Sequence, residues 1–87
     1  MDKNYIIETV NSALAEEFEL DIETLKPEAD IREDLRMDSL DMVDMILALE
    51  RAFNFKLTDR SQVQHVKSMQ DVYEFIEKLA AEGTING

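Results

Sequence analysis

Apolar residues recur at helical spacing along much of this chain, and this spacing constrains the fold more than any other feature of the sequence. Side chains three or four positions apart share one face of an α-helix. One such face is predicted within residues 2–18, where it repeats through Ile6, Val10, Leu14 and Phe18. Another is predicted near the C-terminus, with the buried side chains Met69, Val72, Tyr73, Ile76, Leu79 and Ala80. Both segments are expected to be amphipathic helices that share one core.

Residues suited to capping indicate where the helices begin. Asp38 and Asp41 stand three residues apart before an apolar run, and Ser68 and Asp71 repeat this arrangement. The spacing is typical of a capping box, in which each side chain accepts a hydrogen bond from the other residue's backbone N–H. Asp2 precedes the first apolar run and fits the N-cap role there. Three main helices are therefore predicted to open at these positions.

The other boundaries add one short helix. The second helix is predicted to run to about Ala52, and a short helical turn to run from Thr58 or Asp59 to about Val66. Gly83 follows the last apolar run, at the position where a left-handed residue commonly ends a helix. The chain is therefore predicted to have three main helices and a short one.

The segment from residue 19 to residue 37 lacks a helical period. Its apolar residues are scattered: Leu20, Ile22, Leu25, Ile31 and Leu35. This predicts a long ordered loop without regular structure, pinned to the core. The expected fold is all-α: a small four-helix bundle with the long loop between helices one and two. The 87 residues leave no room for a second core, so residues 1–87 are interpreted as a single domain.

The charge is strongly negative and unevenly spread. With 20 acidic and 9 basic residues the formal net charge is −11, and all of the excess lies in the first 50 residues. Such a surface repels the phosphates of nucleic acids and complements basic protein partners. A nucleic-acid-binding function is therefore excluded.

The composition also limits the chemistry and the location. The sequence has no cysteine, which excludes disulfides, cysteine-ligated metals and a thiol nucleophile of the chain's own. No stretch approaches the roughly 18 apolar residues of a membrane span, and the N-terminus does not resemble a signal peptide. We expect a cytoplasmic protein without a membrane span.

The second helix carries two apolar faces. One face, predicted to enter the core, consists of Met42, Met45, Ile46, Leu49 and Phe53. The other consists of Leu40, Val43 and Leu47, and it lies next to Asp41 and Asp44. Two interpretations remain open on pattern alone: a helix buried on both sides, or an exposed apolar strip bordered by carboxylates that docks a partner.

Ser39 occupies the first position of this helix. Unpaired backbone N–H groups and the positive end of the helix dipole favour a phosphate there. The neighbouring carboxylates of Asp38, Asp41 and Asp44 oppose it unless a divalent cation or a basic partner offsets them. Ordinary N-terminal capping by a serine is the alternative interpretation.

The segment from Asp38 resembles a known attachment site. Asp-Ser-Leu at residues 38–40 opens an acidic amphipathic helix, DSLDMVDMILALERAF, which resembles the phosphopantetheine attachment region of acyl carrier proteins. The similarity extends over nearly the whole chain, through the loop that ends in DIREDLRMDSL and the closing helix SMQDVYEFIEKL.

This resemblance implies a function for the site. It implies that Ser39, within a motif that includes Asp38, is esterified by the phosphate of 4'-phosphopantetheine, which a magnesium-dependent phosphopantetheinyl transferase takes from coenzyme A. The thiol of the arm would carry an acyl group as a thioester, and the chain itself would not be an enzyme. The resemblance assigns partner contacts to Leu40, Asp41, Val43, Asp44, Leu47 and Glu50.

The resemblance also predicts partners and cargo. The expected partners are the transferase and the enzymes of fatty-acid, polyketide or related acyl synthesis and transfer, which would present basic docking patches to a monomeric carrier. Short or medium acyl chains are expected to enter between the helices, where Met42, Met45 and Met69 could line their path. Simple filling of the core by these residues is the alternative.

Two positions depart from the family pattern. Arg36 stands where the pattern L-G-x-D-S has glycine, and it could pair with the phosphate of the arm or shift the loop backbone. Arg51 stands near the end of the second helix, where fatty-acid carriers usually have an acid. Both are expected to affect which partners accept this chain.

The same residues bear on several competing functions. A calcium loop over residues 30–41 fails, because Arg32 and Leu35 occupy its third and sixth positions. A hydrolase built on Ser39 and His65 lacks any sign of an oxyanion hole. Three alternatives remain open: an aminoacyl, peptidyl or D-alanyl carrier, a non-carrier helical adaptor, and diffuse cation binding by the side chains of Asp30, Glu33, Asp34, Asp38 and Asp41. No dedicated metal site is predicted.

Overall fold

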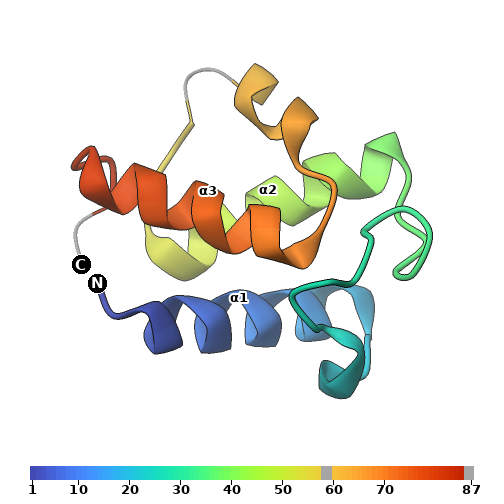
Figure 1. Ribbon diagram of the computed structural model, residues 1–87. Coiled ribbons are helices and arrows are strands. Elements are labelled where there is room, and N and C mark those ends of the chain that lie inside the picture. Colours follow the sequence, from blue (N-terminus) through green and yellow to red (C-terminus); the bar gives the residue numbers. More distant parts are fainter. Residues whose placement is uncertain (58–59, 86–87) are drawn as a thin grey trace.

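Three α-helices form the framework of the computed structural model, which describes residues 1–57 and 60–85 (Figure 1). The helix bounds are α1 Lys3–Phe18, α2 Ser39–Phe53 and α3 Met69–Ala81, with short 3-10 helices η1 Ile22–Thr24 and η2 Arg60–His65. Helix α1 packs against both α2 and α3. No strand occurs in the described ranges, which confirms the all-α prediction. None of the described helices is long and apolar enough to cross a membrane.

The predicted caps open all three α-helices. The side chain of Asp2 accepts a hydrogen bond from the Asn4 backbone N–H at 3.0 Å. The Asp38 carboxylate accepts from the backbone of Asp41 at 2.9 Å, and the Asp41 carboxylate accepts from the backbone of Asp38 at 3.1 Å. Ser68 and Asp71 form the same reciprocal pair at the start of α3. Each cap satisfies backbone N–H groups that have no partner inside the helix.

The C-terminal end of α3 confirms the prediction for Gly83. This glycine has φ +83°, and its N–H donates to the carbonyl of Ala80 at 3.2 Å, while Thr84 N–H donates to the carbonyl of Leu79 at 2.9 Å. The pair of bonds is a Schellman motif, which a residue without a Cβ forms at least cost.

The short helix before α3 agrees with the prediction in part. It occupies Arg60–His65 and stops one residue before Val66. The predicted start at Thr58 or Asp59 lies outside the described residues.

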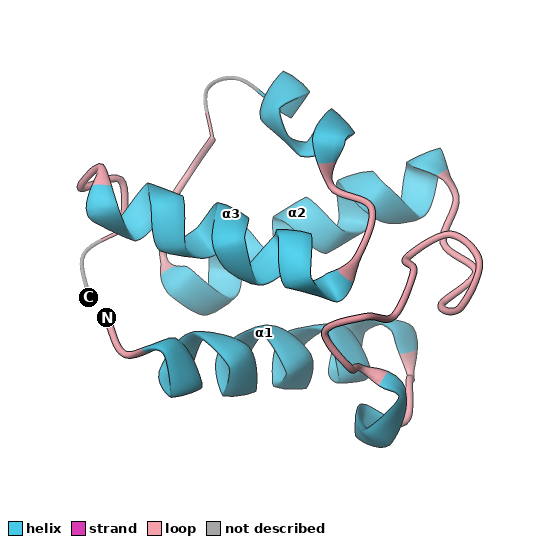
Figure 2. Ribbon diagram, viewed as in Figure 1, coloured by secondary structure: helices cyan, strands magenta, loops and turns pink. Residues whose placement is uncertain are grey.

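The connection from α1 to α2, drawn mainly in pink in Figure 2, is more regular than predicted. The one-turn helix η1 interrupts it, because the Asp21 carboxylate caps the turn by accepting from Glu23 N–H at 3.1 Å. Ile22 was expected to pin this loop but is 52% exposed, whereas Leu25, Ile31 and Leu35 are buried. Local polar capping therefore outweighed the apolar character of Ile22.

The core lies where α1, α2 and α3 meet. Its largest fully buried side chain is Tyr73, whose hydroxyl donates to Asn11 Oδ1 at 2.6 Å. Burial raises the pKa of the Tyr73 hydroxyl. The predicted faces are confirmed, with Phe18 and Ala80 half-buried at the edge and Ile6, Val10, Leu14, Met69, Val72, Ile76 and Leu79 fully enclosed.

Candidate functional site

Ser39 is exposed at the first position of α2. Asp38 is the N-cap of this helix, so the interpretation of Ser39 as an ordinary cap is wrong. Among the described residues, no group forms a hydrogen bond with the Ser39 hydroxyl. The capping box therefore holds the backbone around Ser39 while its hydroxyl stays available for chemistry.

A cavity of about 670 Å³ opens beside Ser39. This volume lies within the range of about 300–1,000 Å³ that is usual for small-ligand sites. Apolar side chains of α2 and of the segment around η2 form one part of the lining, and charged or polar side chains form the rest. The lining residues are Asp30, Arg32, Glu33, Ser39, Met42, Val43, Ile46, Ser61, Val63, Val66 and Lys67.

Most of this cavity could not be predicted from the sequence. Arg32 and Val63 lie more than thirty positions apart, and neither carries a motif that would pair them. Both line one cavity because Asp30 forms an isolated bridge with Ser68, which brings the long loop beside the segment between η2 and α3. Nothing in the local pattern of either segment indicates that bridge.

The three methionines assigned to an acyl path separate in the structure. Met42 is half-buried and lines the cavity. Met45 and Met69 are 1% and 0% exposed and belong to the core, outside that lining. The alternative of simple core filling therefore holds for Met45 and Met69.

The second apolar face of α2 is exposed. Leu40, Val43 and Leu47 are 76%, 41% and 37% exposed, while the face that contains Met45 and Ile46 is buried. Of the two interpretations left open by the sequence, the exposed strip is therefore the one that the structure supports, and a helix buried on both sides is wrong. We call Leu40, Val43 and Leu47 the apolar strip. Asp41 is half-buried and Asp44 is exposed on the same helix.

Two charged residues near the end of α2 have structural partners. The Glu50 carboxylate accepts from the Leu57 backbone N–H at 2.8 Å and so holds the chain that leaves the helix. The Arg51 guanidinium forms an ion pair at 2.8 Å with Glu17 of α1. Both side chains of that pair are substantially exposed, so it contributes at most about 1 kcal/mol. Arg51 thus links α2 to α1, and the docking role assigned to Glu50 stays a prediction.

The acids of the long loop serve mainly as turn caps. Asp30 Oδ1 accepts from the backbone N–H groups of Arg32 and Glu33 at 2.9 and 2.8 Å, and Asp34 accepts from the backbone of Asp30 at 2.7 Å. Across the described ranges, no three His, Cys, Asp or Glu side chains are placed to hold a metal ion.

Arg36 and His65 occupy positions that bear on the earlier alternatives. Arg36 has φ +57°, a left-handed conformation that glycine adopts far more readily. This explains why a glycine would suit the position. His65 is exposed and is not among the residues that line the cavity beside Ser39, so the structure does not assemble the pair needed by the hydrolase interpretation.

Comparisons with known proteins agree with this geometry. Residues 8–76 match the family model described as "Phosphopantetheine attachment site". A protein from Thermosynechococcus vestitus named "Acyl carrier protein" is 38% identical over 81 residues, which cover 93% of this chain and 99% of that protein. The chain belongs to the acyl carrier protein family. Proteins of the same name from Campylobacter concisus and Saccharopolyspora erythraea are 39% and 37% identical, over 85% and 93% of this chain and 95% and 84% of their own lengths.

Membership of this family defines the general function. Acyl carrier proteins are carriers rather than enzymes, and they interact with synthases and transferases. The carrier holds acyl groups as thioesters on a covalently attached 4'-phosphopantetheine group. The sulfur of the thioester belongs to the cofactor, which agrees with a chain that has no cysteine. The comparisons do not favour the aminoacyl, peptidyl or D-alanyl carrier or the helical adaptor.

Proposed function

We propose that Ser39 is the residue to which 4'-phosphopantetheine is attached, within a motif that includes Asp38. The observation that carries this proposal is a serine that is exposed, has no capping role and stands at the N-terminal end of a helix, beside a cavity. A helix N-terminus stabilises a phosphate through its backbone N–H groups and dipole. These features fit the group.

The chemistry then divides between the carrier and its modifying enzyme. The Ser39 oxygen forms a new bond to the phosphorus, the adenosine bisphosphate part of coenzyme A leaves, and the hydroxyl proton passes to a base of the transferase. When attached, the cofactor supplies the thiol that forms the thioester. Ser39 needs no base of its own, because the phosphopantetheinyl transferase supplies both the base and the magnesium ion.

The apolar strip and its neighbouring acids form the proposed docking surface. Leu40, Val43 and Leu47 would meet apolar side chains of partners, while Asp41, Asp44 and Glu50 would face basic patches on the transferase, on acyl-synthesis enzymes and on acyltransferases. Electrostatic attraction of this kind favours fast, salt-sensitive encounters over tight binding. A carrier that visits several enzymes in turn needs such rapid release.

Cargo, assembly and location complete the proposal. Residues 1–87 would act as a single, monomeric domain in the cytoplasm and serve fatty-acid, polyketide or related acyl synthesis. Short or medium acyl chains would enter the cavity beside Ser39, against Met42 and Ile46. Both side chains are apolar, and a methionine side chain adapts readily to ligands of different shape.

Transfer of an acylated arm tests the function. The protein is incubated with acyl-coenzyme A, magnesium and a phosphopantetheinyl transferase of broad specificity, and hydroxylamine-labile acyl groups are measured. Wild type and Ser61→Ala should gain a hydroxylamine-labile acyl group, and Ser39→Ala should not. Ser61 is a matched control because it lines the same cavity and is exposed. Equal labelling of Ser39→Ala and wild type would contradict the proposal.

A further inference from the structure

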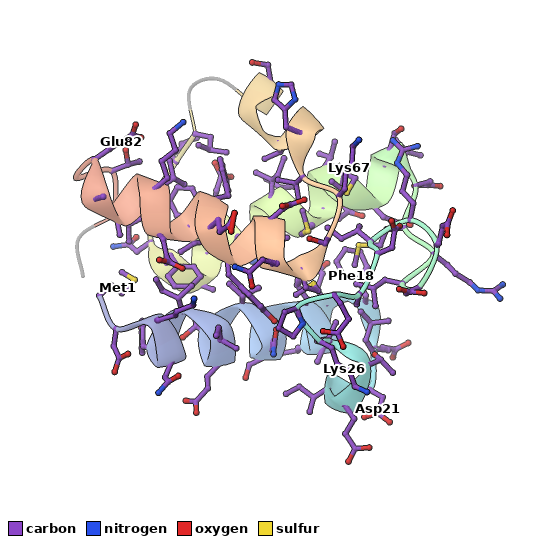
Figure 3. All side chains as sticks on the ribbon, viewed as in Figure 1. Met1, Phe18, Asp21, Lys26, Lys67 and Glu82 are labelled. Carbon is purple, nitrogen blue, oxygen red and sulfur yellow. The ribbon has the colours of Figure 1, made fainter. Side chains whose placement is uncertain are left out.

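We propose that Arg32 and Lys67 are positioning residues for the phosphodiester that joins the arm to the chain. This inference rests on the proposed attachment at Ser39. Arg32 lies in the loop between α1 and α2, and Lys67 lies between η2 and α3, where Figure 3 labels it. Both residues line the cavity that Ser39 also lines.

Backbone hydrogen bonds hold these two residues in place. The N–H of Ile31, next to Arg32, donates to the carbonyl of Lys67 at 2.9 Å. Asp30, which precedes Ile31, and Ser68, which follows Lys67, form the isolated bridge. The main chain at both cations is therefore anchored, although their side chains are exposed. An anchored backbone limits the space that each charged group can explore.

Both cations are available for an anion. In residues 1–57 and 60–85, neither the Arg32 guanidinium nor the Lys67 ammonium group forms a hydrogen bond or an ion pair. Two carboxylates also line the cavity. Asp30 uses one oxygen to accept from two backbone N–H groups, whereas the Glu33 side chain is exposed and would compete for the cations. The charge of Lys67 also interacts with the Asp71 carboxylate at the start of α3, although the two do not form an ion pair. Arg32 and Lys67 therefore offset part of the negative charge that the carboxylates around Ser39 place at this site.

Contact with the phosphodiester would direct the arm. With its negative charge held between Arg32 and Lys67, the rest of the arm follows the apolar wall of the cavity, formed by Met42, Ile46 and Val63. A partner enzyme with a basic patch competes for the same phosphodiester. Docking therefore releases the arm from the cavity by exchanging one set of cations for another.

The experiment compares carriers whose arm is fully attached, as verified by intact mass. The variants are Arg32→Gln with Lys67→Gln, and a control with Lys26→Gln and Lys78→Gln, which changes the charge equally at exposed positions outside the cavity lining. The readouts are the phosphorus-31 relaxation rate of the diester and the rate at which the arm's thiol reacts with an uncharged disulfide reagent. The chain has no cysteine, so the reagent reports on the arm alone.

The proposal predicts a specific pattern of rates. At low salt the thiol should react about 2- to 5-fold faster in the Arg32 and Lys67 double variant than in wild type, a change of the size expected when two exposed ion pairs with the phosphodiester are lost. The transverse relaxation of phosphorus-31 should be slower in this variant, because the phosphodiester moves more freely. About 0.5 M NaCl should remove the difference, because salt screens exposed charges. The control should match wild type, and Glu33→Gln should react more slowly. Equal thiol and relaxation rates in wild type and double variant would overturn the proposal, whereas absence of the attached arm would contradict attachment instead.

Discussion

Replacement of Arg36 by glycine should stabilise the fold. The residue has φ +57°, a conformation that costs an L-amino acid roughly 1–2 kcal/mol. Glycine removes that cost but loses about 0.5–1 kcal/mol more conformational entropy on folding. The net gain in the free energy of unfolding is about 0.5–1 kcal/mol. In a domain of this size such a gain raises Tm by about 2–8 °C.

Thermal and urea unfolding, followed by circular dichroism, measure this gain. Arg36→Ala removes the same charge but keeps a side chain in the left-handed conformation, so it should not reproduce the stabilisation. Arg32→Gly is the second control, because Arg32 is exposed in the same loop and has no positive φ. Glycine there should lower stability by about 0.5–1 kcal/mol. If Arg36→Gly were no more stable than Arg36→Ala, the assignment of backbone strain to this residue would be refuted.

Three further variants test the docking surface, a cap and the core. Leu47→Asp should slow arm attachment and acyl transfer at low salt while changing the unfolding free energy by about 0.5 kcal/mol or less, and unfolding of the domain would rule out a docking role. Hydrogen bonds from the Lys67 and Ser68 backbones lower the pKa of Asp71. The ionised Asp71 carboxylate therefore stabilises the fold above the ordinary carboxyl pKa, and this stabilisation is lost as the pH falls through the lowered pKa of Asp71. Asp71→Asn should lower the free energy of unfolding, measured with urea at pH 7, by about 0.5–1 kcal/mol and should differ little from wild type near pH 2. Tyr73→Phe should cost about 1 kcal/mol in the same assay, because Asn11 loses its 2.6 Å bond; an unchanged midpoint would show that this bond contributes nothing.

Helix positions and caps could be predicted from the sequence because their causes are local. The Asp38 and Asp41 box depends on residues three apart, and the burial of Tyr73 follows from its place in a short periodic run. The exposed strip of α2 could be located in the same way. Whether the strip is exposed or buried could not be predicted, because a second apolar face can equally pack on another helix.

The cavity could not be predicted, since it depends on contacts between distant segments. Arg32 and Lys67 line the same cavity because backbone bonds, including the bridge between Asp30 and Ser68, join their two segments. No local pattern indicates these bonds. The ion pair of Arg51 with Glu17 also joins distant parts of the chain. The sequence showed that Arg51 stands where related carriers usually have an acid, but it did not indicate Glu17 as the partner of Arg51. The resemblance drew attention to Arg36, and the structure added the backbone reason.

Locating the attached group by intact and fragment mass spectrometry tests the central claim most directly. The protein is treated with coenzyme A, magnesium and a phosphopantetheinyl transferase, and then cleaved into peptides. The account predicts one phosphopantetheinyl group per chain, on the peptide that contains Ser39, and none on Ser39→Ala. Attachment at another residue, or no attachment with several transferases, would contradict it.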